Sequence, residues 1–298
     1  MMIILGTRGS KLALIQAEEV KSRINDDVSI RKIKTSADRF LKPLQEFEEK
    51  GIFVKEIEEE LLKGNIDLAV HSMKDIPIEV RESESQRVRS QGLMISAVTK
   101  RISPYDVIVS KNKLGLFSLP KGARIGTGSI RRKLAIQAIR PELEVVYIRG
   151  NIGTRIKMLE KGLDAIVVSE AALIRLSLSH LISEIIPEDI LLPAPGQGSL
   201  GIQIRENDKR LEALTTPLND RESEACIKAE RSFLSFFGQG CSSGISALAK
   251  IKDGKITLKG CIFLEKKMII EKEEGNNPIE VGKALSEKIK GGSLNGYC

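Results

Sequence analysis

The chain has 298 residues, of which 41% are hydrophobic and 29% charged, a composition typical of a soluble globular protein with more than one domain. No apolar run is long enough to cross a bilayer, and the first residues resemble a strand rather than a signal peptide, so we expect a cytoplasmic protein. The net charge of +7 favours acidic partners. Two histidines, and four cysteines without a C-x-x-C pair, argue against histidine catalysis, a metal site and a disulfide scaffold.

The first two thirds of the chain alternate β-type and helical patterns, which predicts parallel α/β layers in two successive units. In the first unit we expect strands at 3–5, 28–34 and 66–70 and helices at 11–24 and 54–63. In the second we expect strands at 106–110, 124–125, 145–148 and 165–168 and helices at 131–139 and 155–161.

The last third has a different organisation. An apolar strand at 200–204 is followed by a long helical pattern at 220–237. After it we expect strands at 245–251, 255–264 and, in a short form, 268–270, and then a final helix at 279–290. An Asp-Gly turn at 253–254 joins two of these strands, which predicts a small α+β domain with an antiparallel sheet.

The two α/β units open alike, with GTRGS (6–10) before KLALIQA and GTGS (126–129) before IRRKLAIQA. Two similar domains would explain the match, and coincidence is the alternative for so short a repeat. Each motif reads as a strand, a Gly-rich turn and a capped helix. Such a turn presents backbone N–H groups and the positive end of a helix dipole to an anion.

Arginines gather where an α/β sheet binds ligands. Arg131 and Arg132 fall in the first turn of a helix, Arg149 follows a strand, and Arg155 begins the next helix, while Arg8 holds the corresponding place in the first unit. Ends of parallel strands and starts of the following helices share one edge of the sheet. Guanidinium groups there would bind a ligand with several carboxylates or phosphates, and the alternative is a solvated basic face.

The strand at 66–70 leads into HSMKD, which puts Lys74 and Asp75 at a carboxyl end as well. Lys74 could bind an anion, and Asp75 could accept N–H donors and stabilise a developing cation. The alternative is a Lys–Asp surface pair. We expect His71, inside the strand, to be a hydrogen-bonded structural residue.

Cys241 lies in the polar segment GQGCSSG (238–244), where a thiol can be exposed and reactive. Cys226 and Cys261 fall in apolar patterns that predict core positions, and Cys298 ends the chain. If one thiol carries a covalent group, Cys241 is the best candidate.

These segments together resemble the porphobilinogen deaminase family, in order and over nearly the whole chain: GTRGSKLALIQA, KGIFVKEIE, HSMKD, GTGSIRR, IRGNIGTR, PGQGSLGI and the ERSF helix leading to GQGC. The resemblance implies an α/β fold of two lobes like type 2 periplasmic binding proteins, with a central cleft, and a small C-terminal α+β domain with an antiparallel sheet. Domain 1 would comprise 1–97 and 198–215, domain 2 98–197, and domain 3 216–298.

The resemblance also implies a site. One dipyrromethane cofactor per chain would be bonded through a thioether to Cys241, with further cofactor contacts from Lys74, Asp75, Thr127, Ser129, Arg131, Arg132 and Arg149. Asp75 would be catalytic, binding pyrrole N–H groups and stabilising positive charge as ammonia leaves and an azafulvene forms. The substrate porphobilinogen would be held by Arg8, Ser10, Arg155 and Arg175.

The implied activity is that of a monomeric, cytoplasmic transferase of tetrapyrrole and heme biosynthesis, hydroxymethylbilane synthase. Four porphobilinogen units would be joined head to tail on the primer with loss of ammonia, and water would release hydroxymethylbilane. Gly128 departs from the family pattern because a serine is usual there. Residues 169–172, SEAA, also depart from it, because the family usually has a small apolar stretch that contains a glycine at this place. We expect the long polar segment 80–90 to be a mobile surface loop.

Two other functions fit part of the sequence. A non-catalytic anion-binding protein of the periplasmic type would explain two α/β lobes and the arginines, but not a Gly-flanked cysteine in a third domain. A nucleic-acid binder would explain the net charge, but Trp is absent, aromatic residues are 4% and no recognition motif is present, so we expect no nucleic-acid partner and no membrane.

Overall fold

The computed structural model describes residues 2–35, 54–77, 92–237, 244–264 and 267–293. Its contacts divide the chain into two units, Met1–Ile102 with Ser199–Glu224 and Ser103–Gly198 with Ala225–Cys298. Cys241, Cys298 and the segment 80–90 lie outside the described residues. The three-domain division stays a prediction.

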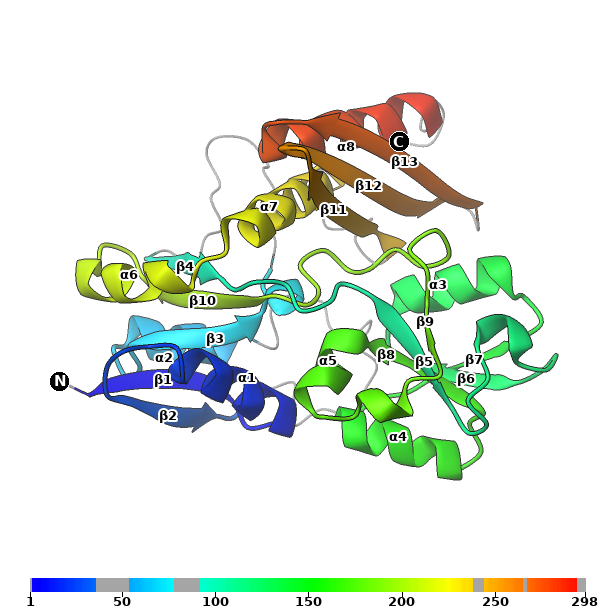
Figure 1. The fold of residues 1–298 in the computed structure, drawn as a ribbon, viewed down its shortest axis with the longest axis horizontal. Coiled ribbons are helices and arrows are strands. Elements are labelled where there is room, and N and C mark those ends of the chain that lie inside the picture. The colour runs from blue at the N-terminus through cyan, green and yellow to red at the C-terminus, as the bar shows by residue number, and fades with distance from the viewer. Residues whose placement is uncertain (1, 36–53, 78–91, 238–243, 265–266, 294–298) are drawn as a thin grey trace. The chain divides into compact units, whose positions relative to one another are not determined.

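The first unit is built on a five-stranded sheet with the order β2-β1-β3-β10-β4. Its strands are β1 (Ile3–Arg8), β2 (Val28–Ile33), β3 (Leu68–Ser72), β4 (Leu93–Val98) and β10 (Leu200–Arg205). β1 runs parallel to β2 and β3, whereas β10 runs antiparallel to β3 and β4. The chain thus returns to the first sheet as β10, which lies beside β3 and β4 in Figure 1 although it is far from both in sequence.

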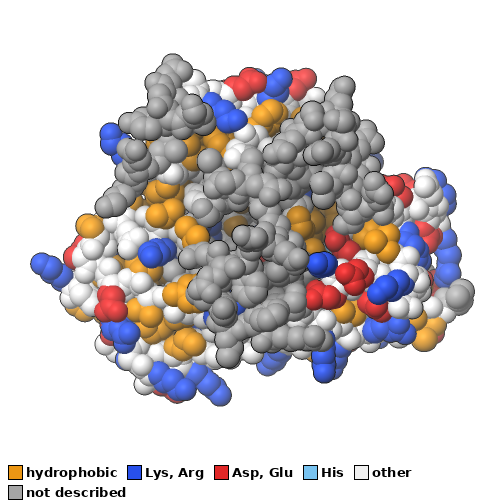
Figure 2. Space-filling view, turned by 180° about the vertical axis from the view of Figure 1, so that it is seen from behind, with side chains coloured by type: hydrophobic (Ala, Val, Ile, Leu, Met, Phe, Trp, Pro, Cys, Tyr) orange, Lys and Arg blue, Asp and Glu red, His pale blue; other side chains and the backbone are white. Residues whose placement is uncertain are grey.

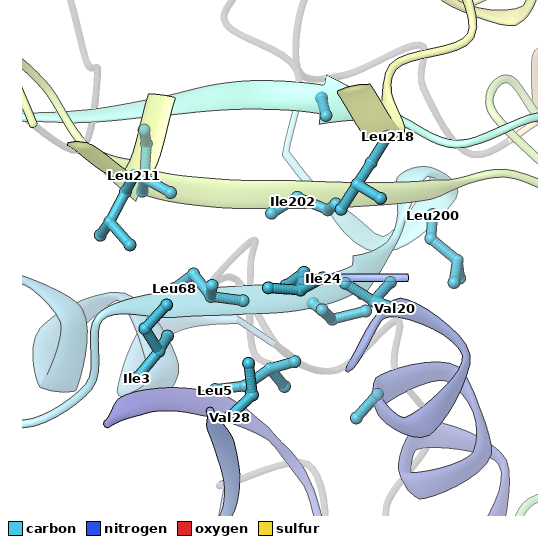
Figure 3. Packing of buried hydrophobic residues seen from close by; sticks show 14 residues of the cluster. Ile3, Leu5, Val20, Ile24, Val28, Leu68, Leu200, Ile202, Leu211 and Leu218 are labelled. Carbon is cyan, nitrogen blue, oxygen red and sulfur yellow. The ribbon is translucent and has the colours of Figure 1, made fainter. Parts of the chain in front are cut away.

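Helices α1 (Lys11–Lys21), α2 (Lys55–Leu62) and α6 (Lys209–Thr215), with the 3-10 turns η3 (Met73–Asp75) and η6 (Thr216–Leu218), complete this unit. Figure 3 shows its core, where Leu5, Leu68 and Ile202 from three neighbouring strands point into one cluster with Val20 of α1. Leu5, Leu68 and Ile202 are fully buried. Burial of each such side chain stabilises the fold by about 1.5–3 kcal/mol. This core therefore stabilises the sheet whose strand ends carry the candidate site.

The second unit repeats this topology. Its sheet has the order β7-β6-β8-β5-β9, with β6 parallel to β7 and β8, and β5 antiparallel to β8 and β9. The strands are β5 (Asp106–Ser110), β6 (Arg124–Thr127), β7 (Glu144–Tyr147), β8 (Ala165–Ser169) and β9 (Glu184–Ile185). The helices are α3 (Ile130–Ile139), α4 (Ile152–Glu160) and α5 (Glu170–Arg175), with the turns η4 (Leu116–Ser118) and η5 (Ser179–Leu181).

The C-terminal part contains α7 (Arg221–Ser235), α8 (Pro278–Ser293) and a three-stranded antiparallel sheet of β11 (Ser246–Lys252), β12 (Lys255–Leu264) and β13 (Lys267–Gly275). Phe233, Leu258 and Leu285 are fully buried in its core. Gly260 leaves room for the Phe233 ring, because a Cβ there would lie 2.6 Å from Phe233 Cζ. The predicted architecture of two α/β units and a small α+β part with an antiparallel sheet is confirmed.

Several elements differ from the sequence prediction. β4, β9, α5 and α6 were not predicted, and β13 is a nine-residue strand rather than a short one. No residue of β13 is buried, so its full length does not show the alternation of apolar and polar residues that predicts a strand. The strand is recognised by its antiparallel pairing with β12. Helix α1 ends at Lys21, earlier than predicted. No described helix has both the length and the apolar character needed to span a membrane.

Candidate active site

In the first unit, the turn after β1 is fixed by hydrogen bonds. Arg8 is the last residue of the strand, and the Oγ of Ser10 caps α1 by accepting from the backbone N–H of Ala13 at 3.3 Å. Thr7 is buried and its hydroxyl donates to the carbonyl of Ala13. The turn therefore places Arg8 and Ser10 together at the edge where β1 ends, the carboxyl edge of this sheet.

Lys74 and Asp75 lie at the same carboxyl edge, because β3 runs parallel to β1 and ends immediately before them. Both residues belong to η3, whose first residue, Met73, donates its backbone N–H to the carbonyl of Ser199 at 3.1 Å. Lys74 is exposed and Asp75 half-buried. The structure thus brings Arg8, Lys74 and Asp75 to neighbouring strand ends, as predicted.

His71 lies in β3 and is buried. Its Nε2 lies 3.2 Å from the Oε1 of Gln203, and Gln203 in turn donates from Nε2 to Glu58 at 2.8 Å. Burial lowers the pKa of His71 to about 4, against the opposing effect of the Gln203 hydrogen bond, and the charge of Arg8 lowers it further. His71 is therefore neutral near pH 7, and the expected hydrogen-bonded structural role is confirmed.

In the second unit, the turn between β6 and α3 carries Thr127 and Ser129. Thr127 is buried and its Oγ1 accepts from the backbone N–H of Ser129 at 3.2 Å, while Ser129 caps α3 through Arg132 N at 3.5 Å. A Cβ on Gly128 would lie 2.5 Å from the carbonyl oxygen of Ile148. With this backbone, glycine is required at 128, so a serine there would force the chain to shift.

Arg131 and Arg132 are buried and bind the same carboxylate. Each is 5% exposed, whereas Asp106 is fully buried. Arg131 Nη2 lies 2.6 Å from one oxygen of Asp106, and Arg132 Nη2 lies 2.6 Å from the other. Arg131 also donates to the carbonyl of Leu192, and Arg132 to that of Val167 at 3.1 Å.

Asp106 is ionised in this arrangement. Burial raises the pKa of Asp106, but the charges of Arg131 and Arg132 outweigh it and hold that pKa well below its usual range. Burial lowers the pKa of Arg131, and Asp106 opposes this. Two guanidinium groups thus share one carboxylate, which leaves one positive charge in excess within the triad.

Sequence reasoning missed Asp106 because it considered only the carboxyl ends of strands. β5 runs antiparallel to β8, and the register places Asp106 opposite Ser169, the last residue of β8. The amino end of β5 therefore lies at the carboxyl edge. An acidic residue that begins an otherwise apolar strand was the available signal.

Arg149 and Arg155 complete the cationic group at this edge. Arg149 follows β7, and Arg155 lies in the first turn of α4, where its Nε donates to the carbonyl of Gly150 at 2.8 Å. Burial lowers the pKa of Arg155 to about 10, and the positive charges of Arg132 and Arg149 lower it further. Arg155 is therefore close enough to Arg132 and Arg149 to be repelled by both, and an anionic ligand would relieve this repulsion.

Arg175, the last residue of α5, is half-buried and donates from Nη1 to the carbonyl of Gly198 at 3.4 Å. The neighbouring segment 169–172, which departs from the family pattern, contains Glu170, and Ser103 donates a hydrogen bond to this carboxylate. Arg175 thus lies in the second unit with the other arginines, while its place relative to Arg8 stays a prediction.

The donors in the second unit fit the carboxylates of a dipyrromethane. The Nε of Arg132 is buried without a hydrogen-bond partner among the described residues. A buried donor of this kind is costly unless a ligand satisfies it, and the excess positive charge selects an anion. No group of three His, Cys, Asp or Glu side chains within the described ranges could hold a metal ion.

Comparison with known proteins gives the family. Residues 3–213 match the model "Porphobilinogen deaminase, dipyromethane cofactor binding domain", and residues 224–291 match "Porphobilinogen deaminase, C-terminal domain". Among solved structures, the chain is similar to the periplasmic VFT2 domain of Bordetella pertussis BvgS, with 15% identity, a TM-score of 0.40, and coverage of 72% of this chain and 85% of that chain.

Curated relatives named porphobilinogen deaminase match over most of their length. The chain is 44% identical to that of Chloroherpeton thalassium over 85% of this chain and 80% of the relative. It is 38% identical to that of Roseiflexus sp. over 96% and 95%, and 41% identical to that of Ehrlichia chaffeensis over 97% and 99%. With both family models matched in order, the chain belongs to the porphobilinogen deaminase family.

Proposed function

We propose that this protein acts as a hydroxymethylbilane synthase. It joins four porphobilinogen units head to tail, with loss of ammonia, and releases the chain by hydrolysis. The observation that carries this proposal is the group of Arg132, Arg149 and Arg155: burial lowers the pKa of Arg155, and the positive charges of Arg132 and Arg149 lower it further. Each porphobilinogen brings two carboxylates, so the growing product is a polyanion that such a group can hold.

Cys241 would hold dipyrromethane through a thioether, and the remaining cofactor contacts would come from Lys74, Asp75, Thr127, Ser129, Arg131, Arg132 and Arg149. When bound, the dipyrromethane supplies the pyrrole carbon onto which the first porphobilinogen is joined. The buried, unpartnered Nε of Arg132 supports a carboxylate ligand at this position.

Asp75 is the proposed catalytic residue. Its carboxylate can accept hydrogen bonds from pyrrole N–H groups and stabilise the positive charge that develops as ammonia leaves. The position of Asp75 supports this role, because η3 is held at the carboxyl edge through the Met73–Ser199 backbone hydrogen bond. Asp75 is half-buried, so its charge is only partly screened by water.

Porphobilinogen would be bound by Arg8, Ser10, Arg155 and Arg175. Ser10 accepts a backbone hydrogen bond at the start of α1, and its hydroxyl hydrogen can donate to a substrate carboxylate. Arg155 is fixed by Gly150 through one donor and has further donors for the same purpose. We propose a monomer in the cytoplasm with this small molecule as its partner.

The alternative functions make different predictions. A non-catalytic anion-binding protein would bind porphobilinogen and leave it unchanged. A nucleic-acid binder needs a basic surface that follows a phosphate backbone. On the face drawn in Figure 2, the Lys and Arg side chains of the described residues lie at several separate places, some of them beside Asp or Glu.

A product assay tests the proposal. Porphobilinogen is added to the purified protein, and released ammonia and tetrapyrrole are measured together. We expect one ammonia for each porphobilinogen consumed and four porphobilinogen for each tetrapyrrole. Binding without release of ammonia would support the anion-binding alternative and contradict the proposal.

A further inference from the structure

Asp106 holds two arginines that would otherwise diverge. Arg131 and Arg132 are consecutive residues of α3, and side chains at consecutive helix positions do not face each other. Here both reach one carboxylate, with Nη2-to-oxygen distances of 2.6 Å for each pair. The Asp106 carboxylate therefore determines where both guanidinium groups lie.

Other contacts fix the carboxylate and the arginines. Gln197, in the segment before β10, donates from Nε2 to Asp106 Oδ1 at 2.9 Å and to the carbonyl of Pro104 at 2.7 Å. The carbonyls of Leu192 and Val167 each bind the Nη1 of one arginine. Each guanidinium is thus held at two points, which fixes the plane in which its remaining donors lie.

Those remaining donors point to a ligand. The triad carries two positive charges and one negative charge, and Arg132 Nε is buried without a partner among the described residues. Arg132 is also close enough to Arg155 for its positive charge to lower the pKa of Arg155. A carboxylate bound at Arg132 Nε would satisfy the donor and the charge together.

We propose that Asp106 is a positioning residue for cofactor assembly. Its carboxylate holds Arg131 and Arg132 in the orientation that receives the carboxylates of the dipyrromethane primer. It also keeps the two guanidinium groups adjacent before the primer arrives, by offsetting their mutual repulsion. This inference rests on the proposed function, and it adds a residue that touches neither cofactor nor substrate.

Positioning and simple charge compensation predict opposite results for Asp106→Asn. The amide has nearly the shape of the carboxylate but lacks its charge and one of its two acceptor oxygens. If only net charge mattered, removing a negative charge would strengthen binding of an anionic primer. If Asp106 positions the arginines, the variant loses their fixed orientation, and primer loading becomes slower.

The test uses loading of the protein with porphobilinogen as the sole small molecule. Each protein is first prepared from cells that make no porphobilinogen, so that it starts without the primer. Intact mass then gives the fraction of protein that carries the primer, and the increase of this fraction with time gives the loading rate. We expect Asp106→Asn to gain the primer at least about tenfold more slowly than the unchanged protein, because misplacing a binding group can slow a reaction by this factor or more. Loading as fast as, or faster than, the unchanged protein would overturn the inference.

Asp164→Asn is the matched control. Asp164 accepts from the backbone N–H of Arg124 at 2.7 Å, where β6 and β8 begin, so it lies at the opposite end of the same sheet. Thermal unfolding is measured for both variants, and loading is compared below both melting temperatures. We expect both variants to be less stable and only Asp106→Asn to load slowly. Equal slowing in the control would overturn the inference.

A second variant covers the case in which Asp106→Asn does not fold. Gln197→Leu keeps all three charges and removes the hydrogen bond to Asp106 Oδ1. We expect slower loading for this variant as well, and unchanged loading would overturn the inference. If the unchanged protein itself never gains the primer mass, the proposed function fails instead, so the two failures are distinguishable.

Discussion

The imidazole of His71 makes the stability of the first unit depend on pH. Its pKa is about 4 in the folded protein and about 6.5 in an unfolded chain. Protons therefore bind the unfolded state preferentially, so stability is complete above pH 6.5 and falls as the pH decreases towards 4. The loss at the lower limit is about 3 kcal/mol.

Urea unfolding between pH 4.5 and 7.5 measures this dependence. His71→Asn keeps a donor for Gln203 but does not titrate, so its stability should vary less with pH in this range. Equal pH dependence in the two proteins would show that His71 is not the group responsible.

Asp75 provides the test of catalysis at the residue scale. Asp75→Asn keeps the shape of the side chain and loses the charge that is proposed to stabilise a cationic transition state, so turnover should fall by about 100-fold or more. The variant should still carry the primer mass. Near-normal turnover by Asp75→Asn that carries the primer would contradict the catalytic role and favour the alternative, in which Lys74 and Asp75 are only a surface pair.

Variants of Arg149 and Arg155 should lose different steps, because one arginine is proposed to bind the primer and the other the substrate. Arg149 is proposed to bind the primer, so Arg149→Leu should accumulate without the added mass. Arg155 is proposed to bind substrate, so Arg155→Leu should carry the primer but need a much higher porphobilinogen concentration. Replacing either by Lys should restore function only in part, because an ammonium lacks the two-pronged geometry of a guanidinium. Full loading and normal turnover in both Leu variants would favour a solvated basic face.

At the scale of elements, Glu230 ties helix α7 to two other segments. It is fully buried, and its two carboxylate oxygens accept from the backbone N–H of Gly196 at 2.7 Å and of Ala249 in β11 at 2.9 Å. The segment that contains Cys241 lies between α7 and β11 in the sequence. Glu230 thus connects the elements on either side of the proposed attachment cysteine.

Glu230→Gln should lower the free energy of unfolding by about 1–3 kcal/mol, because the amide has one acceptor oxygen for two buried donors. Glu222→Gln, at an exposed position on the same helix, should change it by about 0.5 kcal/mol or less. Urea unfolding of the two variants checks this. Similar losses in both would mean that Glu230 makes no special contribution.

The elements show which features a sequence can predict. The turns at 6–10 and 126–129 were predicted with their capping serines, because Gly-rich turns before helices follow local rules. The six residues of α5 and the two of β9 are too few to show a periodic pattern. The Asp106 triad joins the first residue of β5 to two residues of helix α3 that lie 25 and 26 positions later, and periodicity does not report such contacts.

At the scale of the whole molecule, the repeated topology places the Gly-rich turns that carry proposed binding residues at equivalent positions in the two units. In both sheets the central parallel strand, β1 or β6, leads into a Gly-rich turn and a capped helix. Arg8 in the first unit thus corresponds to Gly128 in the second, the capping Ser10 corresponds to the capping Ser129, and both turns lie at a carboxyl edge. The similar openings in the sequence reflect this repeat, so the expectation of two similar lobes is confirmed.

The central claim is that the protein carries a covalent dipyrromethane on Cys241 and extends it. Intact mass spectrometry before and after addition of porphobilinogen tests this directly, with Cys261→Ser as the control for Cys241→Ser. Cys261 is buried, and burial raises its pKa to about 12, so its thiol is protonated and unsuited to attachment. We predict that the unchanged protein and Cys261→Ser carry the primer mass and gain porphobilinogen units in steps, whereas Cys241→Ser carries none. Primer mass retained on Cys241→Ser would contradict the account.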